Sequence, residues 1–203
     1  SYYRSSEVEA VIHKALNYWF TAKPVCLNWW YNQIGIPKTL GTVFILFEKQ
    51  LTPVEKQNAI TVMENAKFGM TGQNKVWLAG NVMMRALLQN DYELVKMARD
   101  TIASEIVTGG TEGIKDDWCF HQHGAQQQFG NYGLSFVSGM SFFSGLFSGT
   151  SLAFDDKQLS ILSTLIDKGY RWVIWKGMMD VNALGRQLFH HAPVHKALSL
   201  AFA

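Results

Sequence analysis

Apolar residues recur every three to four positions along most of this chain, the spacing that places them on one face of an α-helix. In residues 6–20 they fall at Val8, Val11, Ile12, Ala15, Leu16 and Trp19. The same spacing predicts further helices over residues 38–50, 52–67, 74–89, 90–107, 131–147, 155–176 and 193–202. We therefore expect an all-α chain of about eight to ten helices, arranged as antiparallel hairpins.

Capping signals mark two of the predicted helix starts. Thr52 is followed by Pro53 and Glu55, which together predict a capping box with proline in the first helical position. Asn90, with Glu93 three residues later, is predicted to cap the next helix in the same way. Two apolar runs, residues 43–47 and 172–175, fit either a helix or a strand, and their helical neighbours favour helix.

Two long connections, residues 21–37 and 108–128, hold the residues that do not fit a helical core. Residues 116–133 contain His121, His123, several glutamines and Tyr132, with few large apolar side chains. Such polar groups are costly to bury without partners, so they either face water or line a functional pocket. His123 and Tyr132 form a candidate proton-transfer pair. A purely structural role for the histidines is the alternative.

Composition narrows the function classes. The net charge of +2 excludes a broadly basic nucleic-acid binder. No stretch of about 18 residues is free of polar breaks, so no transmembrane helix is expected. Cys26 and Cys119 fit no metal-binding spacing, and they either pair or stay free. The spacing of His121 and His123 also matches no zinc motif. Seven Trp and seven Tyr suit stacking on sugar rings or an aromatic core.

Three further positions each allow a functional and a structural interpretation. The adjacent Trp29 and Trp30 lie in a predicted loop, where at least one ring is expected at a surface, either stacking on a sugar or anchoring the loop. Asn74 stands at a helix start and is either a ligand-binding amide or an ordinary N-cap. Arg186 either makes a surface salt bridge or binds a carboxylate.

Taken together, these segments resemble motifs of the polysaccharide lyases that include chondroitin AC lyase, hyaluronate lyase and xanthan lyase. The order and spacing of the motifs agree across residues 28–186. The matching segments are Asn28-Trp29-Trp30, Gly72-Gln73-Asn74-Lys75, Gln122-His123-Gly124 with Tyr132-Gly133, and Asn182-Ala183-Leu184-Gly185-Arg186.

The resemblance implies an (α/α) toroid, with residues 1–203 as a single, incomplete toroid domain that lacks the family's C-terminal β-sandwich domains. It also implies β-elimination on a uronic-acid polysaccharide, with neither metal nor other cofactor. Asn74 would neutralise the uronate carboxylate. His123 or Tyr132 would take the C5 proton, and Tyr132 would protonate the leaving oxygen. Arg186 would favour the Tyr132 phenolate.

Substrate-binding roles implied by the same resemblance fall on Trp29, Trp30, Asn28, Gln122, Asn182 and His190. The family has a second arginine where His190 stands. The expected partners are an acidic polysaccharide and the family's β domains, without nucleic acid or membrane, and the expected location is secreted or periplasmic.

Two rival functions belong to other classes. The first is a non-catalytic toroid that binds acidic glycans. The second is a hydrolase, which needs a pair of carboxylates placed across the glycosidic bond. Asp116 and Asp117 are adjacent in the sequence, so their side chains would diverge in an extended chain.

Overall fold

The computed structural model describes residues 5–203 and is mostly helical, as the apolar spacing predicts. The chain forms two compact units. The N-terminal unit comprises the residues up to Phe68 together with Trp77–Ala98, and the C-terminal unit comprises Gly69–Val76 and Arg99–Ala203. Helices α4 (Gly72–Gln89) and α5 (Tyr92–Ala103) each contribute residues to both units. The prediction of one toroid domain over residues 1–203 stays a prediction.

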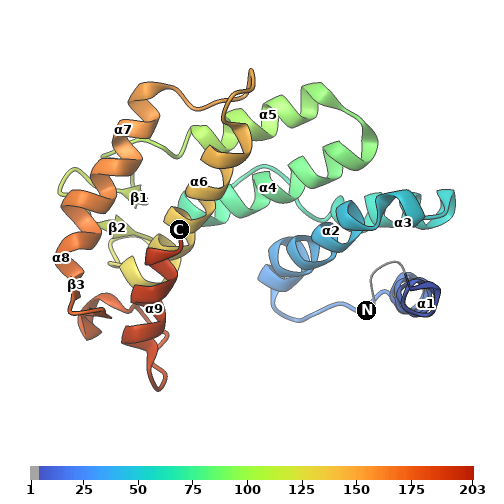
Figure 1. The fold of residues 1–203 in the computed structure, drawn as a ribbon, viewed down its shortest axis with the longest axis horizontal. Helices are drawn as coiled ribbons and strands as arrows, with labels where there is room; N and C mark the ends of the chain where they lie inside the picture. Colours follow the sequence, from blue (N-terminus) through green and yellow to red (C-terminus); the bar gives the residue numbers. More distant parts are fainter. Residues whose placement is uncertain (1–4) are drawn as a thin grey trace. The chain divides into compact units, whose positions relative to one another are not determined.

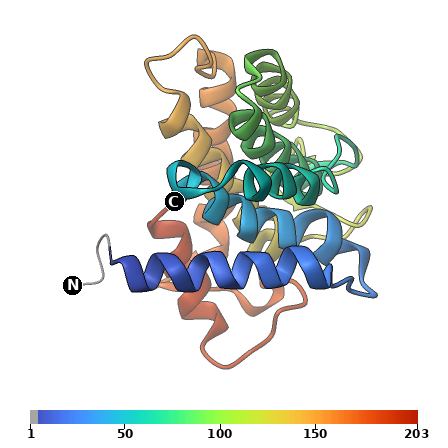
Figure 2. The same cartoon turned by 90° about the vertical axis from the view of Figure 1, so that its right-hand side faces the viewer.

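The N-terminal unit contains three further α-helices around an apolar core. They are α1 (Ser6–Ala22), α2 (Ile36–Leu46) and α3 (Pro53–Met63), with a π-helical turn η1 (Tyr31–Gly35) before α2 and a 3₁₀ turn η2 (Glu48–Gln50) after it. Figure 2 shows α1 lengthwise. One hydrophobic cluster of this unit is built from the buried residues Leu16, Phe20, Phe44, Ala59, Met63 and Leu88.

The region predicted as a loop over residues 21–37 is largely helical from its middle onward. Asn81 of α4 donates a side-chain hydrogen bond to Ile34 O, in the π-helical turn, at 3.0 Å. The ambiguous run at residues 43–47 is helical up to Leu46, so the preference for helix is confirmed. Helix α3 ends at Met63, four residues before the predicted end.

The two predicted caps have different outcomes. The capping box is present: Thr52 Oγ1 accepts from Glu55 N–H at 3.2 Å, and Thr52 N–H donates to Glu55 Oε2 at 2.9 Å. The prediction that Asn90 caps α5 is wrong. Asn90 has a left-handed backbone (φ 53°) after α4, and Asp91 Oδ1 instead accepts from Leu94 N–H at 2.9 Å. Helix α5 then ends at Ala103 rather than residue 107, because Glu105 and Ile106 continue in tight turns.

The C-terminal unit adds two short hairpins to its helices. Strands β1 (Gly113–Ile114) and β2 (Phe120–His121) are antiparallel, with Ile114 opposite Phe120, and β3 (Ile174–Trp175) pairs with β4 (Met178–Met179). The helical elements are η3 (Phe129–Gly133), α6 (Leu134–Phe147), α7 (Asp156–Thr164), η4 (Leu165–Tyr170), α8 (Arg171–Val173), η5 (Val181–Ala183) and α9 (Ala192–Ala201). Helix α9 packs against α6 and β4 (Figure 1).

The sequence pattern missed these strands because two residues are too few to show an alternation. Over residues 172–175 the structure combines both alternatives, a helical turn to Val173 and then strand β3.

A buried tyrosine anchors the π-helical turn η3. Tyr170 is fully buried, and its hydroxyl donates to Phe129 O at 3.0 Å. Burial raises the pKa of Tyr170 well above its usual value. A Cβ added to Gly133 would lie 2.6 Å from the Tyr170 hydroxyl oxygen, so glycine is required for this close approach. The turn is thereby held against the core.

The first prediction concerns Glu55, a carboxylate with 3% side-chain exposure that accepts from His13 Nδ1 at 2.8 Å and Asn17 Nδ2 at 3.0 Å. Glu55→Gln removes the charge from these bonds and is expected to lower the free energy of unfolding by about 1–3 kcal/mol. Urea unfolding measures the change. Glu64→Gln, at an exposed position just after α3, is the matched control and should change stability little.

The same carboxylate sets a pH dependence. Burial alone would raise the pKa of Glu55, but hydrogen bonds from Thr52 and His13 outweigh it and lower the pKa. The folded state therefore favours the carboxylate. Its contribution is present above the ordinary glutamate pKa of about 4.3 and is lost as pH falls through the lower folded value. Equal acid sensitivity of wild type and Glu55→Gln would contradict this account.

Candidate active site

Tyr132 lies at the centre of the candidate site, between His123 and Arg186. His123 Nε2 is 3.0 Å from the Tyr132 hydroxyl oxygen, and Arg186 Nη2 donates to the same oxygen at 3.0 Å. The His123 and Tyr132 rings meet edge to face, with centroids 5.0 Å apart. Tyr132 is only 5% exposed, whereas His123 and Arg186 are exposed. The structure thus brings together three of the four predicted catalytic side chains.

The direction of these hydrogen bonds follows from the chemistry of the groups. A guanidinium only donates, so the Tyr132 oxygen is the acceptor toward Arg186. This leaves the hydroxyl proton of Tyr132 available to His123 Nε2 when that nitrogen is unprotonated. The pair is therefore arranged for proton transfer, with a fixed cation beside the oxygen that would carry negative charge.

Glu112 holds the loop that carries His123. Its carboxylate accepts from Thr71 Oγ1 at 2.6 Å, from Gly124 N–H at 2.9 Å and from Gln122 Nε2. His123 and Gly124 both have left-handed backbones, with φ of 58° and 74°. A histidine pays a conformational cost there, which surrounding contacts must offset. The carboxylate of Glu112 supplies such contacts on both sides of His123.

Gln122 joins the histidine loop to the start of α4. Its Oε1 accepts from Gln73 N–H at 2.9 Å, and its Nε2 donates to Thr71 O at 3.3 Å. Gly72 N–H in turn donates to Glu105 Oε2 at 2.7 Å. Since Gln122 is 1% exposed and engaged in these bonds, we infer that it positions the loop rather than contacting a substrate.

Asn74 is the third residue of α4, inside the helix, so the alternative of an N-cap is wrong. It is 6% exposed, and within residues 5–203 its Oδ1 has no hydrogen-bond partner. Buried amide oxygens without partners are rare in folded proteins and mark positions where a ligand can complete the bonding. Asn74 directly follows Gln73, whose backbone is bonded to the residue preceding His123.

A buried lysine supports the segment that carries Arg186. Lys196 is 5% exposed, and its Nζ donates to Gln187 Oε1 at 3.0 Å and to Gly130 O. Burial lowers the pKa of Lys196. Gly185, with φ 70°, faces Gln128 so closely that a Cβ would lie 2.9 Å from Gln128 Oε1. These contacts place Arg186 over the Tyr132 ring, with its Cζ 5.6 Å from the ring centroid.

The other predicted binding residues of the C-terminal unit are at its surface. Asn182 is exposed, and its backbone N–H donates to Asp180 Oδ1 at 2.8 Å. His190 is also exposed, with its ring centroid 3.7 Å from that of His191.

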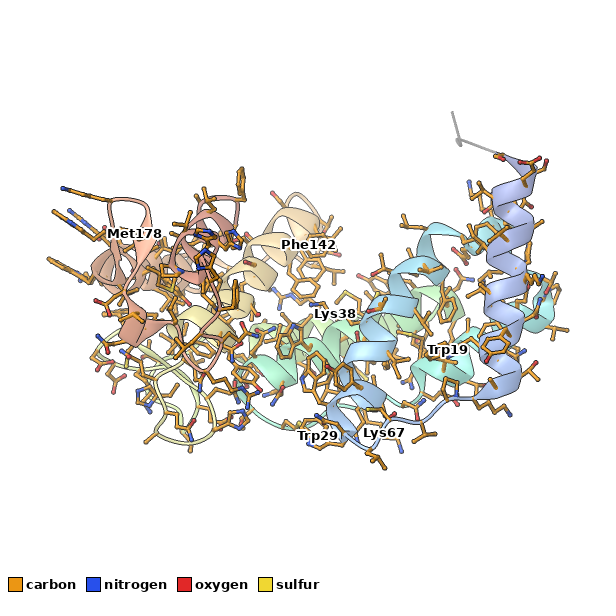
Figure 3. The ribbon with its side chains drawn as sticks, turned by 90° about the horizontal axis from the view of Figure 1, so that it is seen from below. Trp19, Trp29, Lys38, Lys67, Phe142 and Met178 are labelled. Carbon is orange, nitrogen blue, oxygen red and sulfur yellow. The ribbon has the colours of Figure 1, made fainter. Side chains whose placement is uncertain are left out.

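The aromatic motif belongs to the N-terminal unit. Trp29 is 43% exposed, and Figure 3 shows it at the surface of that unit. The Trp30 ring packs edge to face on Trp77, at 5.5 Å between centroids. Asn28 Oδ1 accepts from Trp30 N–H at 3.0 Å, so Asn28 caps this helical segment. One tryptophan is thus exposed and the other anchors the segment, so the two alternatives given for this motif fall on different residues.

Both cysteines are free. Cys119 Sγ donates to Asp117 Oδ1 at 2.8 Å and lies 3.2 Å from His121 Nε2. Burial, together with the Asp117 hydrogen bond and charge, raises the pKa of Cys119 to about 12, so this thiol is unreactive at neutral pH. Across residues 5–203, no three His, Cys, Asp or Glu side chains are grouped to hold a metal ion.

Sequence reasoning missed the two carboxylates that build the site, Glu105 and Glu112. Glu105 also pairs with Lys75 at 2.9 Å. Both follow the end of α5 in the sequence. No apolar periodicity exists there that would distinguish a buried, hydrogen-bonded glutamate from one that faces water. Only the folded structure shows that they face the first turn of α4.

The class of protein that this chain matches is the helical domain of polysaccharide lyases. The chain belongs to polysaccharide lyase family 8: the model of that family's N-terminal α-helical domain matches residues 1–199. The recognition drawn from the sequence motifs and the predicted helical toroid fold are thereby confirmed.

Individual relatives agree with this assignment. Chondroitinase-AC of Pedobacter heparinus is 31% identical over 190 residues, 91% of this chain and 27% of that protein. Xanthan lyase of Bacillus sp. strain GL1 is 28% identical, over 79% of this chain and 18% of that protein. A solved chondroitinase AC lyase structure superposes with a TM-score of 0.84 at 29% identity, covering 99% of this chain and 32% of that one.

The chain therefore spans about a quarter of the length of the chondroitinase-AC that it matches and less of the xanthan lyase. No helix among residues 5–203 is long and apolar enough to cross a membrane.

The second prediction tests Glu112 as the support of the histidine loop. Glu112→Ala removes an acceptor shared by three donors and should destabilise the loop by about 2 kcal/mol. Amide hydrogen exchange over residues 120–126 should become about thirtyfold faster, while exchange in α1 stays unchanged. Asp156→Ala, at an exposed carboxylate of the same unit, is the control. Unchanged exchange over residues 120–126 would show that Glu112 does not hold the loop.

Proposed function

We propose that this chain supplies the helical part of a lyase that cleaves chondroitin-like or hyaluronan-like polysaccharides at a uronic acid by β-elimination. The observation that carries the proposal is the Tyr132 hydroxyl, 3.0 Å from both His123 Nε2 and Arg186 Nη2. Membership of the lyase family and the names of its relatives support the reaction class.

The reaction begins at the proton on C5, which is α to the uronate carboxylate. The negative charge that develops spreads into the carboxylate, so that group must be stabilised in the transition state. The amide of Asn74, which is 6% exposed, would donate from Nδ2 to the carboxylate there. His123, or Tyr132 as its phenolate, takes the C5 proton.

Elimination is completed at C4. The C5–H electron pair forms the C4=C5 double bond, the C4–O bond breaks with its electrons on the departing oxygen, and Tyr132 donates a proton to that oxygen. Arg186 stabilises negative charge on the Tyr132 oxygen while the proton is away. The Tyr132 proton is then restored by way of His123. The products are a new reducing end and a 4,5-unsaturated uronate.

The remaining proposed roles, those in substrate binding, are assigned to exposed side chains. Trp29, with 43% of its surface exposed, is proposed to stack on sugar rings. Asn182 and His190 are proposed to contact the polymer. An acidic polysaccharide is the proposed substrate and the family's β domains the proposed partners. Because such polymers lie outside the cytoplasm, we propose a secreted or periplasmic location.

The third prediction is that Tyr132→Phe abolishes elimination and leaves binding largely intact. The hydroxyl is the proposed proton donor, so turnover should fall by about 10²–10⁴-fold. Ultraviolet absorbance of the conjugated unsaturated uronate, with chondroitin or hyaluronan as substrate, measures turnover, and calorimetry measures binding. Tyr18→Phe, at a hydroxyl on the 75% exposed Tyr18 of α1, is the control.

Three outcomes are distinguishable. Retained turnover in Tyr132→Phe would overturn the assignment of the proton donor. Glycan binding without turnover in the wild-type chain would favour the alternative function, a non-catalytic acidic-glycan-binding toroid. Absence of both would leave the family relationship as a likeness of fold.

The fourth prediction separates chemistry from folding at Asn74. Asn74→Ala breaks no hydrogen bond that its Oδ1 makes within residues 5–203, so the helix content should be retained. Loss of the carboxylate contact should lower the elimination rate by about 10²–10³-fold. Turnover and circular dichroism of the same preparation test both expectations. Collapse of the helix signal would assign Asn74 a structural role.

A further inference from the structure

The last part of the chain has an unusual charge composition. Residues 181–203, all described by the structure, contain Arg186, Lys196 and three histidines, and no aspartate or glutamate. Lys196 is buried and bonded to Gln187 and Gly130, so it adds little to the surface. Arg186 is therefore the exposed cation of fixed charge in this segment, and histidines make up the rest.

The three histidines form one exposed cluster, which we call the histidine cluster: His190, His191 and His195. The His190 and His191 ring centroids are 3.7 Å apart, and those of His191 and His195 are 6.2 Å apart. All three are exposed. The cluster is continuous in sequence with Arg186, which contacts the Tyr132 hydroxyl.

The two elements that helix α9 packs against most extensively carry no carboxylate. Helix α9 packs on α6 and β4, and neither element contains a charged residue. The acid nearest in sequence, Asp180, accepts a hydrogen bond from Asn182 N–H at 2.8 Å. Lys176, on the β3–β4 turn, lies over the Trp175 ring at 5.8 Å and is a further cation. Tyr132, which Arg186 contacts, and His123, whose Nε2 lies 3.0 Å from the Tyr132 oxygen, are further titratable groups beside this segment.

We propose that the histidine cluster is a pH-dependent binding surface for the anionic polymer that the proposed function assigns to this chain. Histidine changes charge between about pH 5 and 8, whereas carboxylates and sulfates of an acidic polysaccharide stay ionised there. Adding up to three charges beside the cations Arg186 and Lys176 increases the attraction of this surface for a polyanion.

A polyanion bound at the cluster stabilises the positively charged form of its histidines. Binding and protonation are therefore coupled, and the coupling is reciprocal: the polymer binds more tightly at lower pH, and binding takes up protons.

The fifth prediction is tested by titration calorimetry with chondroitin sulfate in buffers of different ionisation enthalpy, which counts protons taken up on binding. All samples carry Tyr132→Phe, which prevents turnover. Any contribution of His123 to proton uptake is then common to all the samples that are compared. We expect net proton uptake near pH 6.5 and binding that weakens by roughly tenfold from about pH 5.5 to about pH 7.5.

Two variants of the cluster sharpen the test. The triple variant His190→Gln, His191→Asn, His195→Gln should lose both proton uptake and pH dependence. Asparagine is chosen at residue 191 because it tolerates the left-handed backbone there (φ 61°). The double variant His190→Arg, His195→Arg should instead bind tightly at the higher pH. Lys168→Gln, at an exposed cation of η4, is the control for loss of charge elsewhere.

Proton uptake in the triple variant equal to that of the parent would overturn the proposal, as would pH-independent binding by the parent. Because the readout is binding in a variant without turnover, these results are independent of catalysis. If the wild-type chain carries out elimination normally but takes up no protons on binding, the proposed lyase function stands. Only the proposed role of the histidine cluster is then refuted.

Discussion

The candidate site depends on a carboxylate that bridges two distant parts of the sequence. Glu112 accepts hydrogen bonds from Thr71 and from both sides of His123, at Gln122 and Gly124. One charged acceptor thus fixes the helix start that carries Asn74 and the left-handed loop that carries His123. Hydrogen bonds to a charged group are stronger than neutral ones, which suits a backbone held in a costly conformation.

On this support, the chemistry is divided among groups of different exposure. Tyr132 is nearly buried in the π-helical turn η3, which the buried Tyr170 holds in place, and it therefore has little freedom to reorient. His123 and Arg186 reach it from exposed loops. A fixed proton donor served by accessible partners can exchange its proton with solvent after each turnover while keeping its position relative to a bound sugar.

The sequence predicted much of the fold because helical periodicity and capping residues are local signals. The Thr52–Glu55 capping box and helix α4 are examples, and the family motifs identified the residues that meet at Tyr132. What the sequence could not predict depends on contacts between distant residues. Asn90 is a residue type that often caps helices, yet Asp91 caps α5. Gln122 is a residue type that often binds ligands, yet its amide is bonded to α4. Glu105 and Glu112 gave no signal in the pattern.

The fixed and the titratable cations of residues 181–203 have different consequences for an enzyme acting on a polyanion. Arg186 keeps its charge at any working pH, so its effect on the Tyr132 oxygen is constant. A histidine surface gains or loses charge with the medium, so it can change the residence time of the polymer without altering the chemical step. Protonation of the histidine cluster should change substrate binding while Arg186 keeps its place beside the Tyr132 oxygen. Affinity and catalysis would then be adjusted by separate residues of one short segment.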